Sequence, residues 1–202
     1  MLAAWEGRTE VVSLLLEAGA KVGLQNEVGD SALMLAARTE VVSLLLEAGA
    51  KVDLQNEAGA SALMLAAKES RTEVVSLLLE AGAYVDIQNE HGDSALMLAA
   101  RCCRTDTVSL LLEAGAKIYL RNEYGDSALM EAVRWGRTEV VSLLIEAGAS
   151  IDLQNKEGDS AVIIATTKYN LSVLKELVRA GADLNLQNQE GLRSVVRPRA
   201  RR

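Results

Sequence analysis

Histidine is the side chain that most often acts as a general acid or base, and this 202-residue chain contains only one. His91 is its single histidine and stands next to Gly92, in a stretch of turn-forming residues. A general base needs a nucleophile or a carboxylate held against it, in a site shielded from water. A turn of this kind does not supply such a site. We therefore interpret His91 as a side chain that contacts solvent or a partner.

The two cysteines, Cys102 and Cys103, are adjacent in the sequence. A zinc site normally has four ligands, often as spaced pairs of cysteine or histidine, and this chain has no further cysteine. The pair is also no disulfide framework, which favours a reducing compartment. We expect both residues to lie in a turn between helices, and we expect no metal and no cofactor.

Other catalytic patterns are missing from the sequence. The glycines recur with the repeats described below and are explained by turns and helix ends, not by a phosphate-binding loop. The recurring carboxylates of Glu-Ala-Gly-Ala and Glu-x-Gly-Asp indicate a solvated acidic edge. A catalytic site would have to lie outside the repeats, where only residues 192–202 remain. We therefore predict that the chain is not an enzyme.

The elements that position these residues follow from an internal repeat. The string TEVVSLLLEAGA occurs at 9–20, 39–50 and 72–83, and variants of it occur at 105–116, 138–149 and 171–182. A Gln-Asn pair after each string (Arg-Asn in one unit) recurs at a spacing of 30 residues once and of 33 residues thereafter. Internal periods of this length are typical of stacked repeat architectures.

Each repeat predicts two helices. Ser94 precedes the first apolar segment and can cap its free amides. In the second segment Val108, Leu111 and Leu112 form one apolar stripe at helical spacing, and Gly115 can end the helix in the left-handed conformation. Neither helix can bury its stripe alone. Stability must therefore come from stacking on neighbouring repeats.

One full unit, residues 89–121, resembles the ankyrin repeat. Asn-x-x-Gly-Asp is similar to the hairpin turn of that family, and Ser94-Ala95-Leu96-Met97 stands in the place of its Thr-Pro-Leu-His motif. The resemblance covers about residues 1–191. It implies an all-α fold class, an ankyrin-type solenoid of stacked helix–turn–helix repeats joined by β-hairpin-like turns. We expect an ankyrin-repeat domain over 1–191, with a truncated first unit and a last unit only begun, and an Arg-rich disordered tail over 192–202.

Three departures from the family pattern bear on the fold. The motif histidine is replaced by methionine or isoleucine, so the family's histidine hydrogen bonds between units are lost and we expect a looser stack. The second unit is three residues short at 35–42, which predicts a hairpin in which Ala37 and Arg38 unwind; the alternative is one continuous helix over 31–47. The first unit is expected to expose apolar side chains, which would fit a piece of a longer chain. The replaced motif positions are Met34, Met64, Met97, Met130 and Ile163.

The resemblance also implies where a partner would bind. In ankyrin-type proteins the binding groove is formed by the hairpin tips and the exposed parts of the first helices. The fifth unit brings Trp, Tyr and Arg to such positions, and these residue types are enriched at binding hot spots. The alternative is that the aromatic side chains only cover a seam between units. The predicted partner-binding residues are His91, Asp93, Arg101, Tyr119, Arg121, Tyr124, Asp126, Arg134 and Trp135.

Charge narrows the class of partner. The net charge is −7, and because five of the 21 basic residues lie in 192–202, residues 1–191 carry 16 basic and 28 acidic residues. An acidic body disfavours nucleic acid and favours a basic protein partner. The sequence shows no signal peptide and no membrane-spanning run, so we expect a cytoplasmic monomer, with the nucleus as the alternative location.

The leading functional prediction is a non-catalytic protein–protein interaction module, a scaffold or adaptor. Its main alternative is the recognition arm of a larger multidomain protein, such as a receptor, channel, kinase or ubiquitin-ligase adaptor. A further alternative is a nuclear or nucleic-acid-binding factor that acts through Arg-Pro-Arg-Ala-Arg-Arg at 197–202, since short basic motifs of this kind also address proteins to the nucleus.

Overall fold

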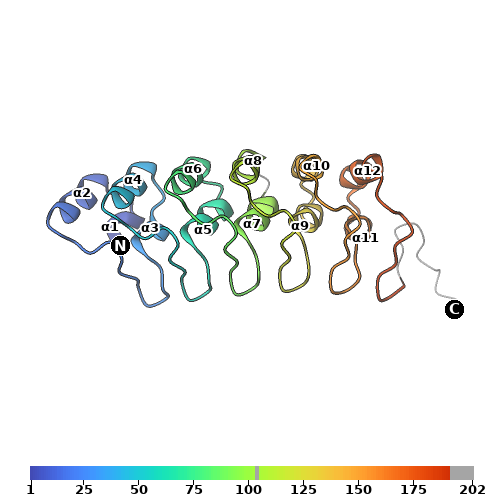
Figure 1. The fold of residues 1–202 in the computed structure, drawn as a ribbon, viewed down its shortest axis with the longest axis horizontal. Coiled ribbons are helices and arrows are strands. Elements are labelled where there is room, and N and C mark those ends of the chain that lie inside the picture. The colour runs from blue at the N-terminus through green and yellow to red at the C-terminus, as the bar shows by residue number, and fades with distance from the viewer. Residues whose placement is uncertain (103–104, 192–202) are drawn as a thin grey trace.

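Helix pairs and hairpins stack side by side in a single row (Figure 1). The computed structural model describes residues 1–102 and 105–191, and in this part of the chain it contains twelve helices and no strand. The shorter inner helices lie next to the hairpins, and the outer helices form the opposite edge (Figure 1). The prediction of an all-α solenoid is confirmed. The inner helices are α1 (Leu2–Trp5), α3 (Ala32–Leu35), α5 (Ala62–Lys68), α7 (Ala95–Cys102), α9 (Ala128–Arg134) and α11 (Ala161–Thr167). The outer helices are α2 (Thr9–Glu17), α4 (Thr39–Glu47), α6 (Thr72–Glu80), α8 (Thr105–Glu113), α10 (Thr138–Glu146) and α12 (Leu171–Arg179).

Local sequence sets the two ends of each helix. The Ser61 hydroxyl accepts a hydrogen bond from the Met64 amide at 3.3 Å and so caps α5, because the first amides of a helix lack partners within it. The outer helix α6 ends where Gly82 takes a φ of +83°. There the Ala83 amide donates to the Leu78 carbonyl and the Gly82 amide to the Leu79 carbonyl, both at 2.9 Å. This pair of bonds is the Schellman motif.

The core lies between neighbouring helix pairs, as a comparison of identical strings shows. Leu45 is 3 % exposed and Leu78 is 1 % exposed, whereas Leu15, at the same position of the first unit, is 47 % exposed. The three leucines belong to the same local sequence. Their burial is therefore decided by whether another unit packs on the N-terminal side, as expected for a solenoid.

The second unit has the shortened hairpin that the sequence predicts. Helix α3 ends at Leu35, and Ala36 has extended backbone angles (φ −68°, ψ 121°). Arg38 is also extended, and α4 begins at Thr39. The three-residue deletion is thus absorbed by the last turn of the inner helix, and the alternative of one continuous helix is wrong. The unwinding begins one residue earlier than predicted, at Ala36.

Ladders of hydrogen bonds tie the hairpins together. The backbone amides of Glu90, Glu123 and Lys156 donate to carbonyls of the preceding hairpin at 3.2, 2.7 and 3.0 Å. Glutamine side chains repeat the pattern: Gln55 Nε2 donates to the Gln88 carbonyl at 3.3 Å, 33 residues further along the chain. Glycine permits this close approach, since a Cβ on Gly92 would lie 3.0 Å from the Asn122 Cα.

An asparagine–aspartate ladder runs beside the backbone ladder. The Nδ2 atoms of Asn56, Asn122, Asn155 and Asn188 donate to the Oδ1 atom of an aspartate in the preceding hairpin at 2.7–3.0 Å, and these aspartates are Asp30, Asp93, Asp126 and Asp159. The motif histidines that would tie neighbouring units in the family are replaced in this chain. Here the hairpins tie the units together, and the replacing residues Met34, Met64, Met97, Met130 and Ile163 lie buried.

Within the described part of the chain, every helix is too short or too polar to cross a membrane.

Candidate functional site

A hollow of about 310 Å³ opens over α9 on the hairpin side of the solenoid. We call it the α9 hollow. Three consecutive units contribute to it: α7 of the fourth unit, the hairpin and inner helix of the fifth, and the hairpin of the sixth. Its lining residues are Arg101, Tyr124, Asp126, Glu131, Arg134, Trp135, Asn155 and Glu157.

Two aromatic side chains border the hollow. Tyr124 stands at a hairpin tip, where its amide donates to Asn122 Oδ1 at 3.0 Å and its carbonyl accepts from the Lys156 amide at 3.0 Å. Trp135 is the C-cap of α9. Tyr124 is 61 % exposed and Trp135 is 53 % exposed, so both rings are open to a partner.

The fifth unit alone carries an aromatic residue at both positions. The position of Tyr124 is occupied in other units by Val28, Ala58, His91 and Glu157. The position of Trp135 is occupied by Glu6, Glu69, Cys102 and Lys168. Near-identical repeats thus present different side chains at one place in the row, while their helices and hairpins stay the same.

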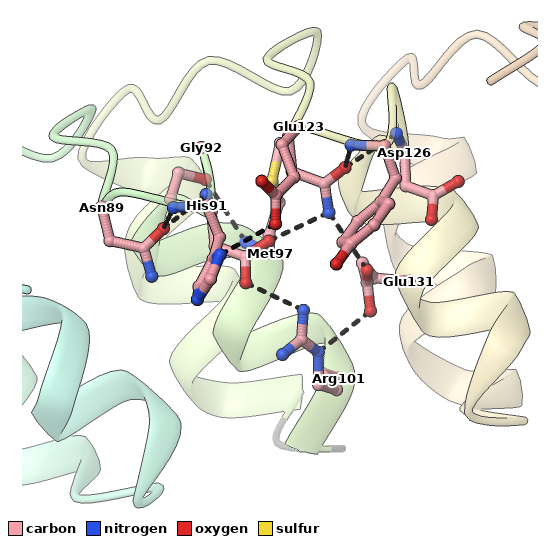
Figure 2. A network of polar contacts seen from close by, with 12 residues as sticks. Asn89, His91, Gly92, Met97, Arg101, Glu123, Asp126 and Glu131 are labelled. Carbon is pink, nitrogen blue, oxygen red and sulfur yellow. Dashed lines mark hydrogen bonds and ion pairs between the residues drawn. The ribbon is translucent and has the colours of Figure 1, made fainter. Parts of the chain in front are cut away.

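Beneath the aromatic rings lies a closed ring of four polar side chains. Arg101 Nη2 donates to Asp93 Oδ2 at 2.9 Å and Arg101 Nε donates to Glu131 Oε2 at 3.0 Å. Asn122 Nδ2 closes the ring with bonds of 3.0 Å to Asp93 Oδ1 and 3.3 Å to Glu131 Oε1. Figure 2 shows the guanidinium of Arg101 turned toward the Glu131 carboxylate. Both carboxylates are buried, at 7 % and 5 % side-chain exposure, so the ring holds Arg101 in one orientation.

The fifth unit repeats part of this arrangement. Arg134 Nη2 donates to Asp126 Oδ2 at 2.6 Å, and Asn155 Nδ2 donates to Asp126 Oδ1 at 2.8 Å. The arginine follows its aspartate by eight residues, as Arg101 follows Asp93. Each arginine is 31 % exposed and each aspartate is nearly buried, and the two guanidinium groups reach the hollow already paired with carboxylates, of which Asp126 and Glu131 also line it.

The charges around the hollow shift two pKa values. Burial alone would lower the pKa of the Arg101 guanidinium, but hydrogen bonds and charge from Glu131 and Asp93 outweigh that cost and raise the pKa. Arg101 is therefore a fixed cation. The charge of Glu123, together with a hydrogen bond to the same carboxylate, raises the pKa of the Tyr124 phenol, because a neighbouring negative charge disfavours the phenolate.

Five of the predicted site residues line the hollow, namely Arg101, Tyr124, Asp126, Arg134 and Trp135. Two more stand next to it: Asp93 lies behind Arg101, and His91 Nδ1 lies 2.8 Å from Glu123 Oε1 at the adjacent hairpin tips.

Tyr119 and Arg121 are placed differently. Arg121 takes the place of the ladder glutamine, with Nε donating to the Gly125 carbonyl at 2.8 Å and Nη2 donating to the Gln154 carbonyl. Its donors are thus used to join hairpins. Tyr119 lies in the turn after α8 and is 64 % exposed. A hydrogen bond to Asp86 is the main cause of a raised pKa of Lys117, to which the negative charge of an ionised Tyr119 adds a smaller contribution. Neither residue is among the described residues that line the hollow.

Three residues that line the hollow were not among the predicted site residues, namely Glu131, Asn155 and Glu157. A signal for Glu131 was present: its counterparts in other units are Leu2, Leu35, Leu65, Leu98 and Ile164. A carboxylate at an apolar position of a helix needs a buried partner, and Arg101 is that partner.

The other candidate chemistry gains no support from the geometry. Cys102 is the half-buried last residue of α7, whereas Cys103 lies outside the described residues, as does the whole Arg-rich segment 192–202. Over 1–102 and 105–191, no three or more His, Cys, Asp or Glu side chains are grouped so that they could hold a metal ion.

Comparison with known proteins agrees with this architecture. The family described as "Ankyrin repeats (3 copies)" matches residues 1–89, 39–122 and 82–155, three overlapping stretches that together span 1–155. A search of the curated proteins finds no match. The family match covers more than half of the chain, and the helix pairs, hairpins and 33-residue period continue beyond it to residue 191. The chain belongs to the ankyrin-repeat family.

Proposed function

We propose that this chain is a non-catalytic scaffold or adaptor that binds a protein partner along its hairpins and inner helices, with the α9 hollow as the anchor site. Ankyrin repeats are generally protein–protein interaction modules. The observation that carries the proposal is local: the one unit with an aromatic residue at both variable positions is also the unit over which a hollow of about 310 Å³ opens.

The physical chemistry of the hollow supports an anchor role. Trp, Tyr and Arg side chains dominate hot spots, which cluster in pockets that a partner can desolvate. The two arginines are already held by buried carboxylates. Binding therefore costs little additional ordering of these long side chains, and such preorganisation increases affinity.

A peptide-display selection against the full chain tests the proposal. Peptides that bind are then titrated against Trp135→Ala and Tyr124→Ala. If the α9 hollow is the anchor site, at least one of the two changes weakens binding by about 30-fold or more, the effect of a hot-spot residue.

The matched control is Trp5→Ala. Trp5 is the other tryptophan, is 63 % exposed and lies in α1, four units away from the hollow. Its replacement should leave the affinity unchanged. Circular dichroism must show that all three variants are folded. Selected peptides that bind folded Trp135→Ala and Tyr124→Ala as tightly as the original chain would contradict the proposal.

A further inference from the structure

The charges that line the α9 hollow favour one kind of side chain. Its two cations are already paired, Arg101 with Asp93 and Glu131, and Arg134 with Asp126. Glu157 also lines the hollow, and its carboxylate forms no ion pair with any residue of 1–102 or 105–191. Among the described residues, the charge in the hollow that is left without a counter-charge is therefore negative.

The aromatic rings add a second attraction for a cation. Arg and Lys side chains are attracted to the faces of Trp and Tyr rings within about 6 Å of the ring centre, and Trp is the strongest of these partners. Trp135 and Tyr124 are both more than half exposed and border the same hollow. An incoming cation therefore meets two open aromatic side chains and the carboxylate of Glu157.

The negative charge continues over the next unit. A second hollow, of about 290 Å³, lies on the C-terminal side of the first and is lined by Glu157, Asp159, Thr167, Asn188, Gln189 and Glu190. Thr167 stands at the position of Arg134, so the arginine that neutralises Asp126 has no counterpart at Asp159. Asp159 accepts a hydrogen bond from Asn188 Nδ2 at 2.7 Å instead. The surface next to the α9 hollow is thus also acidic, in the direction from the fifth unit to the sixth, along which an extended segment of a partner could lie.

We propose that the α9 hollow binds an arginine side chain from a basic segment of the protein partner, with Trp135 and Tyr124 against the guanidinium and Glu157 as its counter-charge. This inference rests on the proposed function. Arginine fits better than lysine because its planar group stacks on aromatic rings and offers two parallel donors to a carboxylate. An acidic side chain would find Arg101 and Arg134 already paired with carboxylates and would meet the carboxylate of Glu157.

The test uses a fluorescein-labelled heptapeptide of alternating glycine and arginine, Gly-Arg-Gly-Arg-Gly-Arg-Gly, titrated into the full chain. Three matched peptides replace arginine by citrulline, leucine or glutamate. Citrulline keeps the shape of arginine and lacks its charge. We expect the arginine peptide to bind at least about tenfold more tightly than any of the other three, a difference of about 1.4 kcal/mol.

Variants of the chain locate the bound arginine. Trp135→Ala, Tyr124→Ala and Glu157→Gln should each weaken the arginine peptide about two- to fivefold, as expected for exposed cation–aromatic and ion pairs. Glu27→Gln is the control for net charge, because Glu27 is an exposed hairpin residue of the second unit, and it should have no effect. In Trp5→Phe, Trp135 is the only tryptophan, and its fluorescence should change during the titration.

Three results would overturn the inference: equal binding of the arginine and citrulline peptides, tighter binding of the leucine peptide, or equal effects of Glu157→Gln and Glu27→Gln. These results leave the proposed function separately testable. If display-selected peptides lose affinity with Trp135→Ala but tolerate citrulline in place of arginine, the hollow is an anchor site for another kind of side chain. If they are insensitive to both changes, the anchor site itself is wrong.

Discussion

At the scale of single residues, the feature that sets the fifth unit apart is Glu131, a carboxylate at a position where the other units carry Leu or Ile. It is 4 % exposed and is satisfied by Arg101 and Asn122. Burying a charge is costly unless hydrogen bonds and a counter-charge compensate for it. The site therefore depends on a carboxylate that is almost completely buried.

Removal of Arg101 tests this dependence. Arg101→Ala leaves Asp93 and Glu131 without their cation, and we expect it to lower the free energy of unfolding by about 2 kcal/mol, less than for a fully buried pair because Arg101 is about a third exposed. Glu131→Leu restores the residue of the other units and leaves Arg101 paired with Asp93, so its cost should be smaller. Urea unfolding of both variants measures the order, and a larger loss in Glu131→Leu would contradict it.

Tyr124 allows a prediction at alkaline pH. Because Glu123 raises the pKa of the Tyr124 phenol above its ordinary value of 10.0, the folded chain holds this proton more tightly than the unfolded chain does. The resulting stabilisation is present below pH 10 and is lost as the pH rises through the folded-state pKa.

A difference titration of phenolate absorbance, between the chain and Tyr124→Phe, isolates this group from the other three tyrosines. The titration midpoint should lie above 10.0, and Glu123→Gln should move it down toward that value. A midpoint for Tyr124 that does not respond to Glu123→Gln would show that the carboxylate is not the cause.

At the scale of elements, three of the outer helices can be compared directly, because α2, α4 and α6 have the same nine residues. They differ only in what packs against them. Leu45 and Leu78 are sealed between two units, whereas Leu15 is half open, and its helix α2 packs on the next outer helix α4. A difference in stability between equivalent substitutions in these helices therefore reports packing alone and no difference in helix propensity.

Truncation of the three leucines makes the comparison quantitative. Leu78→Ala and Leu45→Ala should each lower the free energy of unfolding by about 2–5 kcal/mol, through lost apolar burial and a residual cavity. Leu15→Ala should lower it by about 1 kcal/mol or less, because much of that side chain is already in contact with water. Thermal or urea unfolding gives the values. Equal losses at all three positions would mean that stacking is not what stabilises the solenoid.

The helices could be predicted from the repeats, whereas the contacts that the site side chains make could not. Val108, Leu111 and Leu112 predicted an outer helix because apolar spacing is a local property of the chain. Arg121 looked like a partner-binding residue because its type is common at interfaces. Its actual bonds reach carbonyl groups at Gly125 and at Gln154, 33 residues away, and such a bond depends on the stacking geometry, which the sequence alone does not specify. The ring around Glu131 was missed for the same reason.

At the scale of the whole molecule, the two ends of the row differ. The outer helix of the first unit exposes Val11, Leu14 and Leu15 at 42–66 %. The last outer helix, α12, also exposes apolar side chains, Leu171 at 62 % and Val178 at 47 %, but it carries exposed Lys175 and Arg179 in place of the serine and glutamate of the common string and caps its own start through Asn170. The N-terminal end is further weakened by the four-residue α3. Stability should therefore increase along the chain from the first unit toward the middle.

Hydrogen exchange of three equivalent amides tests this gradient. The amides of Val12, Val75 and Val141 each donate to a carbonyl four residues earlier, at 3.0, 2.9 and 2.8 Å. Their local bonds are alike, so differences in exchange report how readily each unit opens. We expect the amide of Val12 to exchange faster than those of Val75 and Val141. Uniform protection across the three would mean that the row opens as a single cooperative unit.

The hairpin ladders also have a consequence for how such a gene can change. Each backbone bond between neighbouring hairpins recurs one unit later, whereas the asparagine-to-aspartate bond is interrupted once, where Ala60 stands in place of an aspartate. Duplication or loss of DNA that encodes one whole period joins an equivalent hairpin to an equivalent hairpin, and the backbone donors again meet acceptors. Changes of any other length interrupt a period, as the missing three residues did in the second unit, where an inner helix lost its last turn. The length of the molecule can thus change in steps of one unit. The α9 hollow is preserved in any such change that leaves the three units that form it next to one another.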